Sequence, residues 1–209
     1  MLKEVRRFGA LCATFPRMTR TPAILTVLLC LLLPALTLPV GAQTSNASRN
    51  SIAAHPDWPK ANPADVQSVD AILAALYDVI SGPANQPRDW NRFRSLFVPD
   101  ARLIPTRRDK TGPGADVLAL SPEQYQQLAS ARLTKEGFFE HSIHNTTDSF
   151  GDILHVFSTY ESRHTKDGAP FQRGINSIQL LKDGNRYWIV TIFWDVESPT
   201  NPIPAKYLP

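Results

Sequence analysis

Three runs rich in aromatic and β-branched residues close the chain, and short Asp-Gly turns separate them. The runs cover residues 153–164, 171–181 and 186–196, with Asp-Gly pairs at 167–168 and 183–184. Asp-Gly between alternating apolar runs is a strong hairpin signal, because glycine accepts a positive φ without a clash at Cβ. The sequence therefore predicts that the end of the chain forms an antiparallel sheet.

The first half of the folded part is predicted to be helical. Asn62, Pro63 and Asp65 suit the cap and first turn of a helix, and the sequence at 121–124 is a capping box. The expected elements are helices over 62–82, from Asp89 and over 121–137, a short strand over 101–105, a mobile loop over 106–119, and a strand over 138–148. This order predicts an α+β fold with helices on one face of an antiparallel sheet.

The same order resembles the nuclear transport factor 2-like (NTF2-like) superfamily, over about residues 65–197. The stretch Arg-Gly-Ile-Asn-Ser-Ile-Gln-Leu at 173–180, Asp-Gly at 183–184 and Trp-Ile-Val at 188–190 is similar to the secreted SnoaL-like bacterial branch. The resemblance implies a cone: a strongly curved antiparallel sheet wrapped around the N-terminal helices, enclosing an apolar pocket. Such folds include isomerases, dehydratases, cyclases and binding modules, so shape alone does not choose a reaction.

The N-terminal 42 residues have the pattern of a signal peptide. Arg17 and Arg20 precede an apolar run over 23–40, and small residues follow at 41–42. We expect cleavage before Gln43, with Met1 or Met18 as the initiator. The alternative is an uncleaved N-terminal membrane anchor, since about 20 apolar residues can span a bilayer.

Cysteine use and charge narrow the setting. Both cysteines, Cys12 and Cys30, fall within residues 1–42, which favours a bacterial periplasmic or secreted protein without disulfides. That segment also holds five of the 22 basic residues and one of the 19 acidic residues. The remainder is close to neutral, so we expect neither nucleic-acid binding nor stable membrane insertion after cleavage.

Four segments follow from these patterns. They are a signal peptide over 1–42, a disordered linker over 43–62, one domain over 63–198, and a C-terminal tail over 199–209.

The alternation of the strands predicts which side chains face the pocket. A three-residue loop at 182–184 would place Asn176, Trp188 and Trp194 on the apolar inner face, together with Tyr160. We predict that these four residues contact a ligand.

The same register predicts a second, partly apolar face on the convex side of the sheet. Its members include Arg173, Ile175, Ile189, Phe193 and Asp195, and Glu161 is expected opposite Arg173. Because large exposed apolar patches often mark interfaces, we predict a homodimer through this face.

Candidates for chemistry are few. His141 and His144 should point to opposite faces of a strand, which disfavours a two-histidine metal site and leaves one inward histidine as a possible acid or base. Tyr160 could stabilise an oxyanion, and Asp100 is the remaining carboxylate candidate. No phosphate loop, dinucleotide fingerprint, nucleophile elbow or zinc signature occurs after residue 42, so no metal and no cofactor are expected.

The leading interpretation is an exported single-domain protein that binds a small, mostly apolar molecule between helices and sheet. One alternative is a cofactor-free lyase or isomerase that uses histidine and tyrosine for acid–base catalysis. Another is a pocketless interaction domain that serves dimerisation.

Overall fold

The computed structural model describes residues 52–109, 112 and 114–209, all within the unit 43–209. The predicted signal peptide lies outside the described residues and stays a prediction. Within the described part, no helix is long and apolar enough to cross a membrane.

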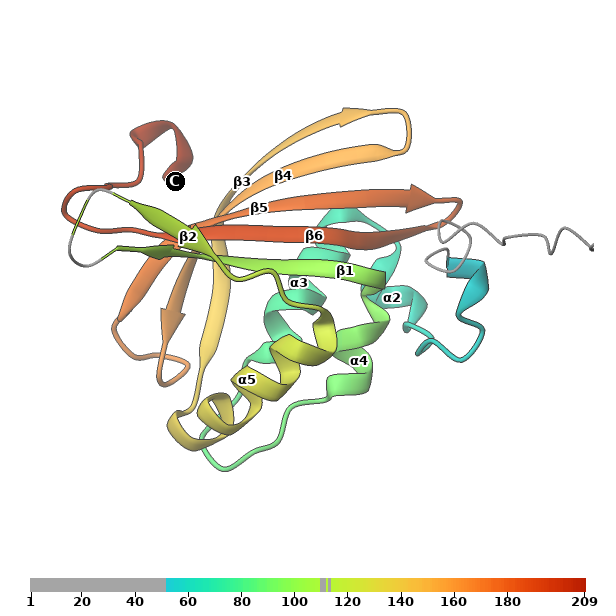
Figure 1. Ribbon diagram of the computed structural model, residues 1–209, viewed down its shortest axis with the longest axis horizontal. Helices are drawn as coiled ribbons and strands as arrows, with labels where there is room; N and C mark the ends of the chain where they lie inside the picture. The colour runs from blue at the N-terminus through green and yellow to red at the C-terminus, as the bar shows by residue number, and fades with distance from the viewer. Residues whose placement is uncertain (1–51, 110–111, 113) are drawn as a thin grey trace, which may run out of the picture. The chain divides into compact units, whose positions relative to one another are not determined.

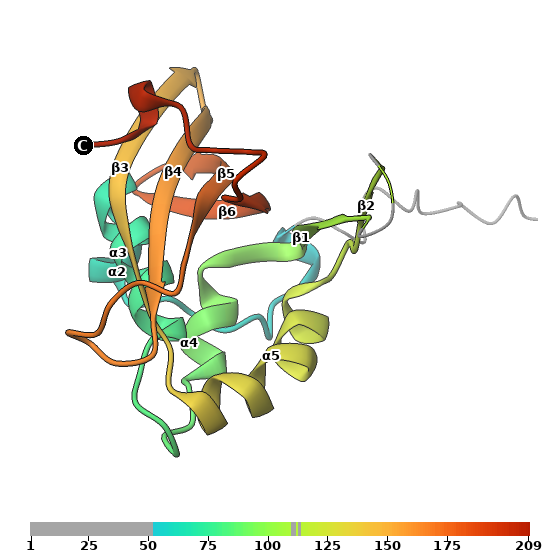
Figure 2. The same cartoon turned by 90° about the vertical axis from the view of Figure 1, so that its left-hand side faces the viewer.

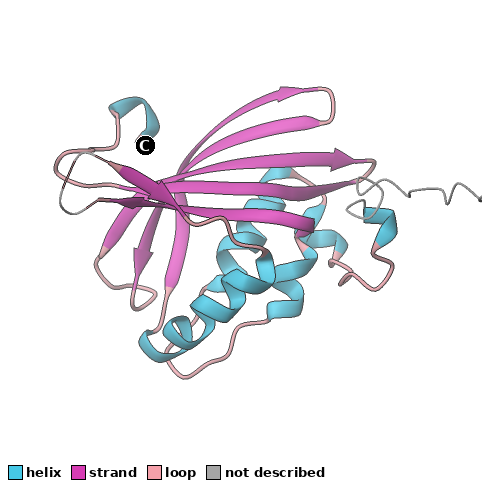
Figure 3. Ribbon diagram, viewed as in Figure 1, coloured by secondary structure: helices cyan, strands magenta, loops and turns pink. Residues whose placement is uncertain are grey.

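A curved six-stranded sheet forms the body of this unit (Figures 1 and 3). The strand order is β2-β1-β6-β5-β4-β3. The strands are β1 Phe97–Arg108, β2 Ala115–Val117, β3 Phe139–Phe150, β4 Ile153–Arg163, β5 Gln172–Asp183 and β6 Arg186–Val196. Figure 2 shows the curvature, with β3 and β4 running steeply across the direction of β1.

The α+β class is confirmed, but the sheet is mixed rather than purely antiparallel. Strands β3 to β6 pair antiparallel, as the hairpin signals predict, whereas β1 pairs in parallel with β6. The chain enters β1 from the helical half, so no hairpin joins these two strands and their directions are free to agree. The expected loop over 106–119 also contains a pairing, because β2 lies antiparallel to the end of β1.

The helices cover the concave face of the sheet, below it in Figure 1. They are α2 Pro63–Val66, α3 Val69–Ile80, α4 Trp90–Ser95 and α5 Pro122–Glu136, with short 3₁₀ turns at η1 Ile52–Ala54 and η2 Ala205–Tyr207. The single helix predicted over 62–82 is split, because the Ser68 side chain accepts from the amide of Ala71 and starts α3 anew. The predicted capping box is present at Ser121 and Gln124.

Arg88 joins the ends of α3 and α5. Its guanidinium donates to the carbonyl oxygens of Ile80 at 2.9 Å, Gly82 at 2.7 Å and Leu133 at 3.0 Å. The last carbonyls of a helix have no partner within the helix. This buried arginine supplies the donors that water would otherwise supply to them.

The register of the last hairpin differs from the predicted one. Gly184 and Asn185 form a two-residue turn between Asp183 and Arg186, so the three-residue loop was wrong. A bulge then shifts the register: Ile189 lies opposite Leu180, but Thr191 lies opposite Gln179.

This bulge decides which side chains are interior. A two-residue turn alone would expose the apolar residues of the second half of β6, and one extra residue restores the alternation. Ile192 is consequently buried, as predicted, whereas Val190 is 36% exposed and Ile189 lies in the core at 0% exposure. Ile189 therefore does not belong to the convex face on which it was predicted.

The preceding hairpin has the expected register. Glu161 lies opposite Arg173, as predicted. Their ion pairs are separate, however: Arg173 pairs with Glu197, and Glu161 with Arg163.

Residues before and after the predicted domain, 63–198, also form hydrogen bonds with it. Trp58 Nε1 donates to the carbonyl of Phe97 at 2.9 Å. At the other end, Thr159 Oγ1 donates to the carbonyl of Tyr207 at 2.7 Å. Residues assigned to the linker and the tail therefore pack against the fold.

Candidate functional site

A cavity of about 120 Å³ lies between the helices and the concave face of the sheet. Most of its walls are aromatic and aliphatic, and polar groups enter from β3, β4, β5 and α5. The lining residues are Leu76, Tyr77, Ile80, Phe93, Leu103, Tyr125, Arg132, Phe138, Glu140, Tyr160, Gln172, Asn176, Ile192 and Trp194. We call this hollow the interior cavity.

Glu140 supplies a carboxyl group to the interior cavity. It lies on the same face of β3 as Ser142, and Ser162 Oγ donates to its Oε2 at 2.6 Å. The residue keeps some accessible surface, but desolvation of the carboxyl raises its pKa to about 7; hydrogen bonding from Ser162 and the charge of Arg132 oppose this shift. Near neutral pH the group can therefore either donate or accept a proton.

Tyr160 places a hydroxyl in the same cavity. Gln172 Nε2 donates to this hydroxyl at 3.2 Å, and the side chain is 1% exposed. Burial, with a further contribution from the charge of Glu140, raises the pKa of Tyr160, so the hydroxyl stays protonated and can donate to a ligand oxygen. Gly174 makes room for it, because a Cβ there would lie 2.6 Å from the tyrosine oxygen.

A second polar cluster is complete within the protein. Tyr77 Oη lies 2.6 Å from Ser158 Oγ and accepts from Asn176 Nδ2 at 3.1 Å. All three residues are buried, and burial raises the pKa of Tyr77. Asn176 thus lines the cavity with its amide nitrogen already bonded to Tyr77, which offsets the cost of burying the amide.

The two predicted tryptophans lie in different places. Trp194 lines the interior cavity, with its ring edge-on to Tyr125 at 6.4 Å between centroids. Trp188 lies opposite Leu181, under the guanidinium of Arg186, and donates to Asp183. The bulge in β6 separates them, so Trp188 does not line this cavity.

Neither histidine candidate lines the interior cavity. His141 lies opposite Glu161 and His144 opposite Thr159, with a register shift between Ser142 and His144. The bulge cancels the odd spacing and places both histidines on the face away from Ser142, so the expectation of one inward histidine was wrong. Asp100 is exposed, at a positive φ of 63°, and is also outside the cavity.

Glu140 is the important residue that the sequence reasoning missed. The turn alone could not reveal it: the two-residue turn at Gly151 and Asp152 sets a register that would put Ile143 opposite Tyr160, and only the bulge between Ser142 and His144 puts Ser142 there. Alternation then places Glu140 on the inner face as well.

A groove of about 590 Å³ runs between α3 and the edge strand β3. Tyr77 and Glu140 contribute to its walls as well as to the interior cavity, and His141 lies along it. Glu140 therefore lies between the interior cavity and this surface groove.

The donor set does not suggest a metal centre. Among the described residues, no group of three or more histidine, cysteine, aspartate or glutamate side chains could hold a metal ion. The arrangement instead offers one titratable carboxyl group, a protonated tyrosine hydroxyl and apolar walls.

Comparisons with known proteins do not assign a family. No protein-family model matches the chain. Four sequences of the penicillin-binding protein activator LpoA from Vibrio cholerae serotype O1 are 30% identical over 142 residues, covering 60% of this chain. The chain spans only 23% of the length of these curated relatives.

Several solved structures have a similar chain path at low identity. A protein of unknown function with a cystatin-like fold from Nostoc punctiforme is 13% identical, with a TM-score of 0.48, covering 63% of this chain and 90% of that one. An NTF2-like protein from Silicibacter pomeroyi is 12% identical, with a TM-score of 0.42, covering 62% and 92%. Likeness at this level assigns no activity.

Proposed function

We propose that the protein binds a small, mostly apolar molecule in the interior cavity, with Glu140 and Tyr160 at its polar end. The observation that carries the proposal is a carboxyl group with a pKa of about 7 in the wall of a largely apolar cavity. Burying an ionisable group costs stability, so its retention favours a role in recognition or chemistry.

The volume limits the ligand. An apolar cavity of about 150 Å³ accepts benzene, and this cavity measures about 120 Å³. We therefore expect a ligand about the size of a single ring, with a carbonyl or hydroxyl group that bonds to Glu140 or Tyr160. Trp194 and Phe93 would contact its apolar part.

Mass spectrometry of a metabolite extract tests this proposal. Purified protein is incubated with the extract, and both retained and consumed compounds are measured. We expect one compound to be retained at up to one equivalent, and retention to fall at least tenfold in Glu140→Gln and Tyr160→Phe. Tyr187→Phe, another tyrosine of the sheet that does not line the cavity, is the control. Unchanged retention in both cavity variants would refute the proposed site.

A cofactor-free isomerase or lyase is the second candidate, favoured by the pairing of Glu140 with a protonated tyrosine in one cavity. Glu140 would accept a proton from the substrate while Tyr160 donates to the oxygen on which charge develops. Consumption far beyond one equivalent, lost in Glu140→Gln, supports catalysis. Retention without consumption supports a binding module.

Assignment to the SnoaL-like branch, export and dimerisation remain proposals. Sequencing the N-terminus of the exported protein would test cleavage before Gln43. Light scattering at micromolar concentration would test the homodimer, which a monomeric mass would refute. A melting temperature that no retained compound changes would favour the pocketless interaction domain.

A further inference from the structure

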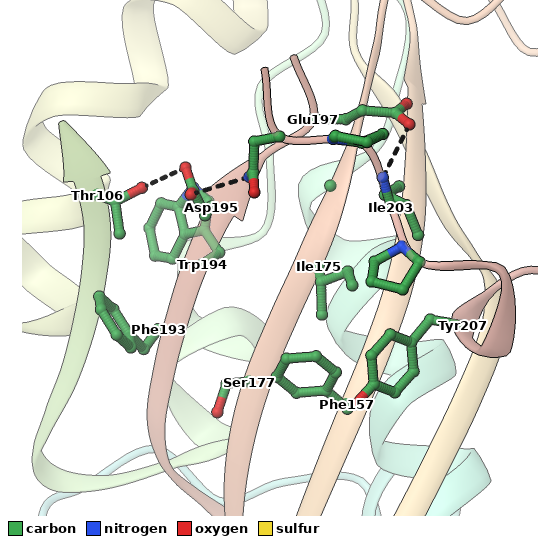
Figure 4. A pocket seen from close by; sticks show the side chains of 14 residues that line it. Thr106, Phe157, Ile175, Ser177, Phe193, Trp194, Asp195, Glu197, Ile203 and Tyr207 are labelled. Atoms are coloured by element: carbon green, nitrogen blue, oxygen red, sulfur yellow. Dashed lines mark hydrogen bonds between the residues drawn. The ribbon is translucent and has the colours of Figure 1, made fainter. Parts of the chain in front are cut away.

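A second hollow, of about 300 Å³, lies on the face of the sheet opposite the helices (Figure 4). Strands β4, β5 and β6 form its floor, and the C-terminal segment 197–207 forms one of its walls. We call it the outer pocket. It is distinct from the interior cavity, with which it shares only Trp194 among its lining residues.

The C-terminal wall is held by specific bonds. The carbonyl of Tyr207 accepts from Thr159 Oγ1, and Glu197 Oε1 accepts from the amide of Ile203 at 3.1 Å. Pro202 and Pro204 flank Ile203 and fix its neighbours' φ angles. Ile203 itself is 9% exposed. The segment is therefore a built part of the pocket.

The surfaces that face the pocket are mainly apolar and aromatic. Figure 4 shows Phe157 and Tyr207 side by side, with ring centroids 4.9 Å apart, and Ile175 beside them on β5. Phe193 forms the far side and is 42% exposed. Aromatic walls of this kind favour a flat apolar ligand, because rings pack against one another by offset or edge contacts.

The charges at one end of the pocket are already paired. Asp195 pairs with Arg108 at 2.6 Å, and Glu197 with Arg173 at 2.8 Å. These ion pairs leave no excess of either sign, so a charged ligand would find no unpaired counter-ion among these four residues. The pocket therefore favours a neutral ligand.

Ser177 supplies a hydrogen-bonding group to the pocket wall. Its Oγ lies 3.0 Å from His155 Nε2. A hydroxyl oxygen has two lone pairs, so Ser177 can accept a bond from a ligand N–H or O–H while bonded to His155.

We propose that the outer pocket is a second binding site, for a neutral, flat aromatic molecule that donates a hydrogen bond to Ser177. Its volume is at the lower end of the range of about 300–1,000 Å³ typical of small-molecule sites, and more than twice that of the interior cavity. A molecule of two or three rings therefore suits the outer pocket and exceeds the interior cavity.

The dye N-phenyl-1-naphthylamine tests the proposal, because it is neutral, aromatic, carries one N–H and fluoresces in apolar surroundings. We expect the full chain to bind one equivalent. Ile203→Ala, which opens the C-terminal wall, and Ile175→Trp, which fills the floor, should each weaken binding at least tenfold. Ser177→Ala should weaken it about threefold to tenfold. Ile153→Ala is the matched control, since this isoleucine is 63% exposed and does not line the pocket.

Three outcomes would overturn the proposal. The first is that the unaltered protein does not bind the dye. The second is that Ile203→Ala and Ile175→Trp bind the dye as tightly as the unaltered protein does. The third is that Ile153→Ala loses as much affinity as these two variants. Circular dichroism spectra and melting temperatures of the variants separate loss of the pocket from loss of the fold. A dye affinity that depends on Glu140→Gln would place the dye in the interior cavity and contradict the outer site.

Discussion

The interior cavity and the outer pocket lie on opposite faces of the same strands, yet they are built differently. Asn176 lines the first and Ser177 the second, because neighbouring residues of a strand point to opposite faces. Buried hydrogen bonds support the interior cavity, including those that Arg88 donates to carbonyls at the ends of α3 and α5. The outer pocket is closed by the end of the chain and by half-exposed ion pairs. One sheet thus carries a small cavity supported by buried hydrogen bonds and a larger pocket whose C-terminal wall is held by few bonds.

The largest expected effect concerns Arg88, which joins the ends of helices α3 and α5. Arg88→Met removes the arginine donors to the carbonyls of Ile80 and Leu133, and one of the two donors to Gly82, which keeps the amide of Phe138; this should lower the free energy of unfolding by about 4 kcal/mol. Urea denaturation measures this change. Arg102→Met is the control, since Arg102 is exposed and its loss should cost less than about 0.5 kcal/mol. Similar losses of stability in both variants would show that the hydrogen bonds of Arg88 do not stabilise the fold more than an exposed arginine does.

Glu140→Gln should show a pH-dependent gain in stability. The ordinary pKa of 4.5 applies to the unfolded chain, and the folded value is about 7, so the folded state binds more protons between these values. Stability therefore falls as pH rises from about 4.5 to 7, by about 2–3 kcal/mol in total. The variant should exceed the unaltered protein by that amount at pH 8.

The same variant supplies its own control at low pH. At pH 4 the carboxyl is protonated in both states, so the two proteins should have equal free energies of unfolding. A constant difference between pH 4 and pH 8 would contradict the desolvated carboxyl.

Tyr77→Phe tests the buried polar cluster. Removing the hydroxyl leaves Ser158 and Asn176 without a shared partner inside the fold, and should cost about 1.5 kcal/mol. Tyr187→Phe, whose hydroxyl makes no hydrogen bond within the described residues, should change stability by less than about 0.5 kcal/mol. Thermal or urea unfolding distinguishes the two.

The smallest effect is expected at the outer pocket. Thr159→Val keeps the side-chain shape and removes one bond to the carbonyl of Tyr207, which should cost about 0.5–1 kcal/mol. Hydrogen exchange should speed up at 203–208 and remain unchanged in α3. A loss above about 2 kcal/mol would mean that the C-terminal wall belongs to the cooperative core, and the contrast between the two hollows would fail.

The local signals of the sequence predicted the elements well, because they act over a few residues. The cap at Asn62, the box at Ser121 and the Asp-Gly turns all lie where helices and hairpins begin or end. Long-range outcomes were less predictable. Nothing local to Phe97–Arg108 indicates a parallel partner, and that pairing depends on how the helical half meets the sheet.

The site was harder to predict, because two bulges decide it. A bulge changes the face of every later residue in its strand, and neither the shift near Ile143 nor the one at Val190 carries a glycine or other clear signal. Tyr160 and Asn176 lie on strands without a bulge and are placed correctly on the inner face. Trp194 is also placed correctly, but only because the extra residue of the bulge at Val190 offsets the third loop residue that was wrongly predicted. The histidines and Trp188 are not.

The position of the C-terminal segment also limits how two copies of the chain can meet. A covalently attached segment competes for its own surface at an effective concentration of about millimolar. A second copy at micromolar concentration would need about a thousandfold higher intrinsic affinity, or about 4 kcal/mol, to displace it. If two copies associate over this face, as proposed, they should therefore meet at the strip that the segment leaves open, where Val117 is 50% and Phe193 42% exposed.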